Sequence, residues 1–435
     1  MTINEQLYQE AKKIIPGGTQ LLSKRPEMFV PDQWINYADR AKGCEVWDLD
    51  GNKYIDMITM GIGSCTLGFA DEDVNNAVKK AIDKGSMSSL NFPEEVELAK
   101  LMLKLHPWAE MARFTRSGGE AMSVAVRIAR AASGKDKVLF CGYHGWHDWY
   151  ISANLSSNKA LDGQLLPGLE PRGIPRTLTE TSIPFNWNNT EEFLNLIKKY
   201  DGEVGVVVLE SVRNYNPEKE FVETIRKVTK EKGIVFIVDE ITSGFRINVG
   251  GAHIVYGVEP DMAVFAKAIS NGYPLGAIIG KKQFMQSAQD TFISSTFWTE
   301  RIGSVAGLAT IQKMLDLDLP THLQKVGKTV QEGWKTLAAK HGYNIHLSGI
   351  YPLSHFGFET KNPLLEKTVF SKMMLEYNYL ASTVLYSSYA HTDEIVKDYL
   401  EKVDLTFGRM SKMTEEDMMK YIDGKICHSG FKRLN

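Results

Sequence analysis

Two stretches decide the fold predicted for this chain: Ile-Val-Phe-Ile-Val-Asp-Glu at residues 234–240 and Met-Ala-Val-Phe-Ala-Lys at residues 262–267. Each is a short apolar run that ends on a charged side chain. Short apolar runs rich in β-branched residues are typical of strands buried on both faces of a parallel sheet. Ligands bind beyond the carboxyl ends of such strands, so Asp239 and Lys267 are expected at a binding site.

The same kind of apolar run recurs through the middle of the chain, with helical patterns between the runs. This alternation predicts an α/β fold, with a mostly parallel central sheet covered by helices on both faces. The predicted strands are 137–141, 204–209, 234–238, 262–266 and 276–280. The predicted helices between them are 120–132, 190–200 and 218–232.

Both ends of the chain have a mixed α+β character instead. Residues 44–56 contain an Asp-Gly-Asn turn between apolar residues, which predicts a hairpin. We therefore expect a large α/β domain over residues 56–318 and a smaller α+β domain formed by residues 1–55 together with residues 319–435. Further helices are predicted at 3–14, 72–84, 94–106 and 322–341.

Lys267 and Asp239 carry the chemical prediction. Burial lowers the pKa of a lysine amine, and a neutral amine can form a Schiff base with a carbonyl. Pyridoxal phosphate needs a lysine for its aldehyde and an acid for its pyridine nitrogen, so this pair of residues suits that cofactor. Two simpler interpretations stay open. Asp239 could form an ion pair with Arg246 or Lys267, and lysine is most often a surface residue.

Two loops could serve the same cofactor. Ser-Gly-Gly-Glu-Ala at residues 117–121 precedes a helical stripe and could seat a phosphate on free N–H groups. The same pattern is also a helix capping box, which needs no ligand. Tyr-His-Gly-Trp-His at residues 143–147 follows a strand and could stack an aromatic ring on a flat cofactor, or could simply be buried packing. A metal site at His144 and His147 is disfavoured, because no third ligand is spaced nearby.

The composition narrows the classes of function. The 435 residues are 43% apolar and 24% charged, as in ordinary globular proteins, and carry a net charge of −3. This charge gives no electrostatic reason to expect nucleic acid or an anionic membrane as a partner. The four cysteines have no CxxC spacing, and the N-terminus lacks the basic and apolar segments of a secretion signal. We therefore expect a cytoplasmic protein.

Together these motifs resemble the class III (subgroup II) aminotransferases of fold type I, and in particular the glutamate-1-semialdehyde aminomutases. Residues 117–121 resemble the family's SGxEA phosphate loop, and residues 143–145 resemble its YHG. Residues 239–246, DEITSGFR, resemble its DEVxTGFR, and Lys267 stands where the family has its Schiff-base lysine. The similarity also covers PGG at 16–18, WDLDGNKYID at 47–56 and AHTDE at 390–394.

The resemblance implies an enzyme that uses pyridoxal 5'-phosphate. Lys267 would carry the cofactor and move a proton, and Asp239 would keep the ring nitrogen protonated. The implied reaction moves an amino group from a small-molecule donor to an aldehyde or keto acceptor through pyridoxamine phosphate. Thr296 would reach the phosphate of the neighbouring subunit, which implies a homodimer with shared active sites. The implied cofactor contacts are Ser117, Gly118, Gly119, Tyr143, His144, Glu210, Asp239, Ile241, Lys267 and Thr296.

Several positions depart from the family pattern. Gly119 replaces a threonine of the phosphate loop, and Arg116 stands where asparagine is usual. Lys24 and Arg25 occupy the region of a substrate-carboxylate arginine, so these two residues and Arg116 are candidate substrate-binding residues. A 1,2-aminomutase and a pyridoxal-phosphate-dependent decarboxylase or racemase are alternatives on the same scaffold. A nicotinamide-dependent dehydrogenase is disfavoured because no GxGxxG opens a helix, and a non-catalytic binding protein would not need Lys267.

Overall fold

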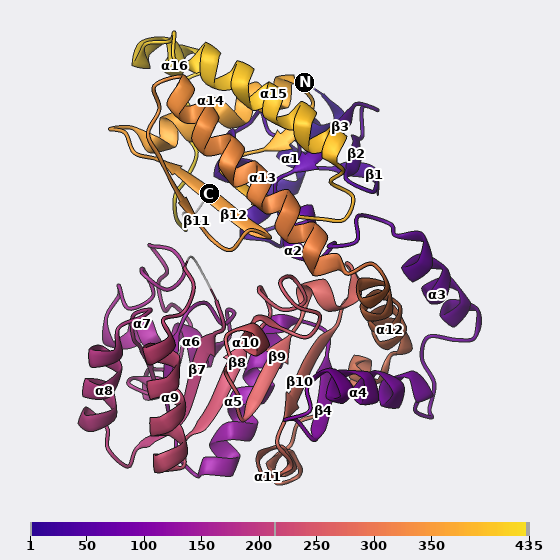
Figure 1. Ribbon diagram of the computed structural model, residues 1–435, viewed down its shortest axis with the longest axis vertical. Coiled ribbons are helices and arrows are strands. Elements are labelled where there is room, and N and C mark those ends of the chain that lie inside the picture. Colours follow the sequence, from indigo (N-terminus) through magenta and orange to yellow (C-terminus); the bar gives the residue numbers. More distant parts are fainter. Residues whose placement is uncertain (1, 213–214, 432–435) are drawn as a thin grey trace. The chain divides into compact units, whose positions relative to one another are not determined.

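The computed structural model describes residues 2–212 and 215–431, which divide into two compact units (Figure 1). Unit 1 combines the chain up to Asp71 with the chain from Thr321 onward, and unit 2 runs from Glu72 to Pro320. The domain limits of 55 and 318 expected from the sequence stay predictions. No helix in the described residues combines the length and the low polarity that a membrane crossing requires.

Unit 2 is built on a seven-stranded sheet in the order β4-β10-β9-β8-β7-β5-β6. Its strands pair in parallel from β6 through β9, whereas β10 runs antiparallel to both β9 and β4. The predicted mostly parallel sheet is therefore confirmed for the described residues. The strands are β4 Met111–Thr115, β5 Lys137–Cys141, β6 Ser182–Pro184, β7 Val204–Glu210, β8 Val235–Asp239, β9 Met262–Phe265 and β10 Gly276–Gly280.

Helices cover both faces of this sheet. Neighbouring strand residues point to opposite faces. In β8, Ile237 belongs to the apolar cluster under α5, and Phe236 belongs to the cluster under α8 and α9. The larger helices are α3 Glu72–Asp83, α4 Pro93–Leu105, α5 Gly118–Ser133, α8 Thr190–Lys199, α9 Lys219–Lys232 and α12 Arg301–Asp316. The short helical turns are α6 Asp148–Ile151, α7 Ala153–Ser156, α10 Ala252–Val255, α11 Lys282–Met285, η3 Arg176–Leu178, η4 Lys267–Ser270, η5 Gln286–Gln289 and η6 Thr296–Thr299.

Helix α5 shows why the sequence folds this way next to the sheet. Its N-cap is Ser117, whose hydroxyl accepts a hydrogen bond from the backbone N–H of Glu120. Its C-cap is Gly134, which has a left-handed φ of 65°. The helix turns a stripe of mostly small apolar residues, including Ala121 and Ala125, against the sheet. These caps and this stripe fix α5 directly after β4, with its first turn at the carboxyl edge of the sheet.

Unit 1 packs helices against two small sheets, in the orders β1-β2-β3-β13 and β11-β12-β14. The aromatic side chains of Trp334, Phe356, Phe370 and Phe407 dominate its core. Its helices are α1 Ile3–Ile14, η1 Leu22–Lys24, η2 Pro26–Met28, α2 Met60–Gly63, α13 Leu319–Lys340, α14 Pro363–Glu376, α15 Asp393–Met410 and α16 Glu415–Tyr421. Its strands are β1 Ala38–Lys42, β2 Glu45–Asp48, β3 Lys53–Met57, β11 Ile345–Ser348, β12 Leu353–Phe358, β13 Tyr379–Ala381 and β14 Val384–Tyr386.

Candidate active site

The candidate residues of unit 2 leave the sheet at one edge. Glu210 ends β7, Asp239 ends β8, and Lys267 follows β9. Glu210 and Asp239 are register partners in the parallel ladder, so their backbones lie side by side. Tyr143 follows β5, and Ser117 follows β4, which runs in the same direction as β9 because both are antiparallel to β10. The topology therefore gathers these five residues at the carboxyl edge, where α/β sheets bind ligands.

Asp239 is a buried, oriented carboxylate. Its side chain is 3% exposed, and its Oδ2 lies 2.8 Å from Nδ1 of His144. The other ring nitrogen of His144 lies 3.1 Å from the carbonyl oxygen of Cys141. Both ring nitrogens of His144 therefore lie at hydrogen-bond distance from oxygen atoms, which fixes the orientation of the ring beside Asp239. The backbone N–H of Ile241 donates to Oδ1 at 2.8 Å and completes the orientation of the carboxylate.

The contact between Asp239 and His144 adds a partner that the sequence reasoning did not name for Asp239. The His144 side chain is itself fully buried. The buried carboxylate thus has a buried side-chain partner at hydrogen-bond distance, as burial of such a group requires.

Lys267 has an unusual backbone. Its φ is 47°, in the left-handed region that a non-glycine residue enters at a cost of about 1–3 kcal/mol. Such strain persists only where the surroundings fix it, and it is common at active sites. The amine Nζ donates a 2.8 Å hydrogen bond to the hydroxyl of Thr242. The carbonyl of Thr242 in turn accepts a 2.6 Å hydrogen bond from Nε of Arg246.

Thr242 contacts Lys267, and the sequence reasoning did not single it out. It lies within the quoted stretch 239–246, at the position that the family motif leaves unspecified. Only the turn after β8 brings its hydroxyl to Lys267, and no spacing rule predicts that turn.

Glu210 and Gly142 fix the loop that carries Tyr143. The backbone N–H of Tyr143 donates to Oε2 of Glu210 at 3.1 Å. Gly142 has a φ of 114°, and a Cβ added there would lie 2.4 Å from that same oxygen, so the position requires glycine. Burial, and then the nearby Asp239 carboxylate, raise the pKa of the Tyr143 hydroxyl. Tyr143 therefore stays protonated and uncharged at neutral pH.

The first turn of α5 fits both interpretations of residues 117–121, the helix capping box and the phosphate seat. The capping box is present, since Ser117 Oγ accepts from the N–H of Glu120 at 3.4 Å and Glu120 Oε2 accepts from the N–H of Ser117 at 3.1 Å. Within the described residues the backbone N–H groups of Gly118 and Gly119 have no hydrogen bond. A Cβ on Gly118 would lie 3.0 Å from Ile241, so the glycine allows that side chain to approach. Two such N–H groups at a helix start suit an anion.

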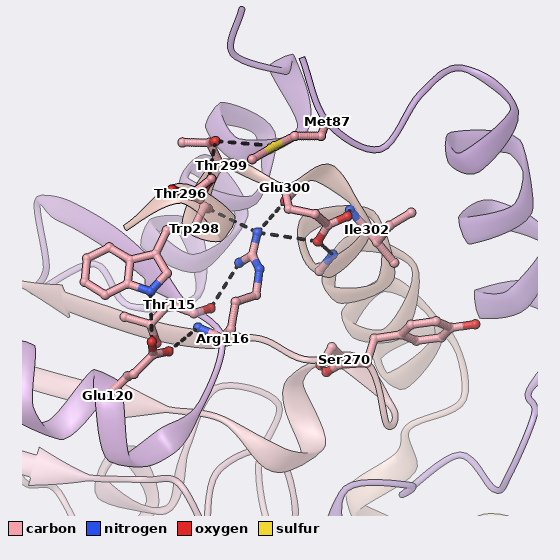
Figure 2. Close-up of polar contacts among 12 residues, drawn as sticks. Met87, Thr115, Arg116, Glu120, Ser270, Thr296, Trp298, Thr299, Glu300 and Ile302 are labelled. Atoms are coloured by element: carbon pink, nitrogen blue, oxygen red, sulfur yellow. Dashed lines mark hydrogen bonds and ion pairs between the residues drawn. The ribbon is translucent and has the colours of Figure 1, made fainter. Parts of the chain in front are cut away.

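The remaining candidates are placed as follows. Thr296 begins η6 and is exposed. Arg116 donates from its guanidinium to the carbonyl oxygens of Thr115, Trp298 and Glu300 (Figure 2). These contacts join Arg116 to the protein backbone, and its role toward a substrate stays a prediction. Lys24 and Arg25 belong to unit 1, where Lys24 ends η1 and is exposed. Their role toward a substrate also stays a prediction.

Comparisons with known proteins cover most of the chain. The model of the family described as aminotransferase class-III matches residues 31–365. The 3-aminobutyryl-CoA aminotransferase of Cloacimonas acidaminovorans (strain Evry) is 29% identical over 94% of this chain and 97% of its own. A glutamate-1-semialdehyde 2,1-aminomutase of Methanobrevibacter smithii is 34% identical over 79% of this chain and 80% of its own. The FumI protein of Sphingopyxis sp. MTA144, solved in its pyridoxal phosphate internal aldimine form, superposes with a TM-score of 0.86 at 23% identity, covering 95% of this chain and 98% of that one.

Proposed function

Because this chain belongs to the class III aminotransferase family, we propose that Lys267 and Asp239 are the residues with which it moves an amino group from donor to acceptor. The protein is a pyridoxal-phosphate-dependent enzyme that acts on an amino donor and an oxo acceptor. The observation that carries the residue assignment is the strained backbone of Lys267, whose amine is held by Thr242 beside the strand that ends in Asp239.

The residues at the carboxyl edge fit this cofactor. The Asp239 carboxylate, paired with His144, would face the pyridine nitrogen. Tyr143 and Ile241 would lie on the two faces of the ring. The free N–H groups at the start of α5 would hold the phosphate, and the neighbouring subunit's copy of Thr296 would add a hydroxyl. When bound, pyridoxal phosphate supplies an electron-withdrawing ring that acidifies the amine-bearing carbon of the substrate.

The protein's own groups then manage protons. Lys267 Nζ takes a proton from the amine-bearing carbon of the donor, and it returns a proton on the way to the product. Thr242 Oγ1 orients Nζ for both transfers. Asp239 would hold a proton on the pyridine nitrogen of the bound cofactor, and the burial of Asp239 and His144 would exclude water from that contact.

A test of the assignment uses the absorption spectrum of the purified protein. The wild type with added pyridoxal phosphate should develop a yellow band that borohydride removes, with the label recovered by peptide mass spectrometry on Lys267. Lys267→Ala should form no such band. Lys281→Ala is the matched control, because Lys281 follows β10 at the opposite edge of the sheet and should label like wild type. A label found elsewhere would remove Lys267 from its role.

A 1,2-aminomutase is the second candidate, since a relative with that name is 34% identical to this chain. A mutase uses one molecule as both donor and acceptor. It should therefore rearrange glutamate-1-semialdehyde when no second substrate is added. An aminotransferase should instead release one oxo product for each acceptor consumed, and it should stop when the acceptor is withheld. Product analysis with and without an acceptor separates the two.

The proposal includes a cytoplasmic homodimer with shared sites. Thr296 is exposed in the single chain, and its neighbour Phe297 is 66% exposed. Exposed aromatic side chains favour an interface with another chain. Light scattering of the purified protein should give a mass near twice 48.9 kDa, and a monomer mass would refute shared sites. Cell fractionation tests the location.

A further inference from the structure

The segment before α12 is irregular and is held by arginine side chains. We call residues 292–300 the strap; apart from the turn η6 it has no regular structure, and most of it is exposed. Arg113 of β4 donates to the carbonyl of residue 293 at 2.8 Å, and Arg127 of α5 donates to that of residue 292 at 3.2 Å. These bonds hold the start of the strap against the β4–α5 unit.

Arg116 holds the end of the strap, beside η6. Its NH2 group donates to the carbonyl oxygen of Trp298 at 3.1 Å and also to that of Glu300. The same group lies 3.6 Å from the Glu300 carboxylate, and the Arg116 side chain is only 14% exposed. Its NH1 group donates to the carbonyl of Thr115 at 3.0 Å. Figure 2 shows the guanidinium directed at the backbone of the strap.

Glu120 links Trp298 of the strap to the first turn of α5. One of its carboxylate oxygens accepts from the backbone N–H groups of Arg116 at 2.9 Å and Ser117 at 3.1 Å. The other accepts from the indole N–H of Trp298 at 3.3 Å. The strap that presents Thr296 is therefore tied to the helix start that forms the proposed phosphate seat.

The guanidinium has little capacity left for a substrate. Burial lowers the pKa of Arg116, the Glu300 and Glu120 carboxylates oppose this shift, and an arginine keeps its charge in any case. Both hydrogens of NH2 are directed at strap carbonyls, and Nε is buried without a partner in the described residues. Arginine often binds a carboxylate through two parallel N–H donors, and NH2 has no hydrogen left to form such a pair with a substrate.

We propose that Arg116 is a positioning residue that fixes the strap, and with it Thr296, relative to the start of α5. Cofactor retention depends on Arg116, whereas recognition of the amino donor does not. This inference rests on the proposed function, because it takes the Gly118–Gly119 N–H groups as ligands of the phosphate in their own chain and Thr296 as a ligand of the phosphate in the neighbouring subunit. The lysine ammonium is a compact group at one point, so it cannot span the separate carbonyl oxygens of Thr115, Trp298 and Glu300 as the planar guanidinium does.

The experiment compares Arg116→Gln and Arg116→Lys with Arg130→Gln. Arg130 is the matched control: it lies on α5 and also donates to backbone carbonyls, those of Asp136 and Thr181, away from the strap. For each protein, pyridoxal phosphate is titrated into the apo form, and the donor KM is measured at saturating cofactor. Hydrogen–deuterium exchange of the peptide that covers residues 292–300 then reports on the strap in the assembled protein.

Both Arg116 variants should bind pyridoxal phosphate about tenfold more weakly, a change of about 1.4 kcal/mol. Their donor KM should stay within about twofold of wild type, and backbone exchange in the strap should be faster. Arg130→Gln should change neither cofactor affinity nor exchange in the strap. If Arg116→Gln does not fold, Arg116→Lys carries the same comparison.

An unchanged cofactor affinity together with a donor KM raised about tenfold would overturn the proposal and restore a substrate role for Arg116. Unchanged exchange in the strap would overturn it as well, whatever the affinity. A wild type that takes up no pyridoxal phosphate would instead count against the proposed function, and the exchange rates would still test the strap.

Discussion

At the residue scale, the contribution of the Thr242 hydroxyl to catalysis can be tested by one substitution. Thr242→Val keeps the shape of the side chain but leaves the Lys267 amine without its 2.8 Å acceptor. A hydrogen bond contributes about 0.5–1.5 kcal/mol, so we expect kcat to fall about twofold to tenfold. Cofactor content, measured by absorbance, should not change. Thr242→Ser should recover most of the rate, and a valine variant that loses cofactor instead of turnover would contradict this role.

His391 in unit 1 gives a pH prediction. It is fully buried, its Nε2 contacts the carbonyl of Asp56 at 2.9 Å, and its Nδ1 accepts from the N–H of Ser388 at 3.2 Å, so the ring is neutral. Burial, and then repulsion from His322, lower the pKa of His391 to about 4 from 6.5. The unfolded chain therefore binds this proton at a higher pH than the folded chain does.

The free energy of unfolding should accordingly fall as the pH drops from about 6.5 towards the folded pKa of about 4, by at most about 3 kcal/mol from this residue. Below that pH the residue adds no further change. Urea unfolding at several pH values gives the free energy of unfolding at each pH. The slope of this free energy against pH should be smaller for His391→Gln than for wild type. His346→Gln is the control, because that ring is exposed and should leave the slope unchanged. Equal slopes for all three proteins would refute the assignment.

The positions of Asp239 and Lys267 could be predicted from the sequence. An acid and a lysine at the ends of neighbouring apolar runs pointed to one cofactor, and the structure places both at the carboxyl edge. Their roles remain predictions. The partner of Asp239 was not predictable, because His144 reaches it from another strand. The backbone contacts of Arg116 could likewise not be predicted from the sequence, because they depend on the backbone conformation of residues 298–300.

At the element scale, α13 contains two glycines, and changing each to alanine should have a different effect on the stability of the protein. A Cβ on Gly327 would lie 1.8 Å from the carbonyl oxygen of Tyr351, which is backbone and cannot move away. A Cβ on Gly333 would lie 2.5 Å from a terminal methyl of Leu400, which can rotate. Both changes to alanine gain about 1 kcal/mol of helix propensity.

Gly327→Ala should therefore lower the free energy of unfolding by about 2–3 kcal/mol, because the overpacking outweighs the propensity gain. Gly333→Ala should stay within about 1 kcal/mol of wild type. Urea unfolding followed by tryptophan fluorescence measures both, since Trp334 lies in the core of unit 1. Equal losses in the two variants would show that Leu400 is as immobile as the backbone.

Elements were predictable in proportion to their apolar periodicity. The runs predicted as strands 137–141 and 276–280 form β5 and β10 at those bounds. Strand β4 was missed because Arg113 interrupts its apolar pattern, and β6 because it has three residues and ends on a proline. The reversed direction of β10 could not be derived either, since an apolar run carries no information on its neighbours.

At the scale of the whole molecule, the proposed shared sites predict complementation between two damaged chains. Lys267→Ala removes the amine, and Thr296→Ala removes the hydroxyl offered to the neighbouring subunit. In a mixed dimer one site would combine an intact Lys267 with an intact Thr296. Random mixing should recover about a quarter of wild-type activity at limiting pyridoxal phosphate. Activity no higher than the mean of the two parent proteins would mean that each site uses its own Thr296.

The parallel pairing of β3 with β13 bears on how the chain is made. Ile55 and Tyr379 are register partners in this ladder, although the ribosome synthesises them far apart in time. At about 5–20 residues per second, β3 waits roughly 15–60 s for its neighbour. All of unit 2, which ends at Pro320, leaves the ribosome in that interval. The earliest strands to be translated are thus among the latest to gain a full set of neighbours, and their open edge is where a chaperone would be needed during translation.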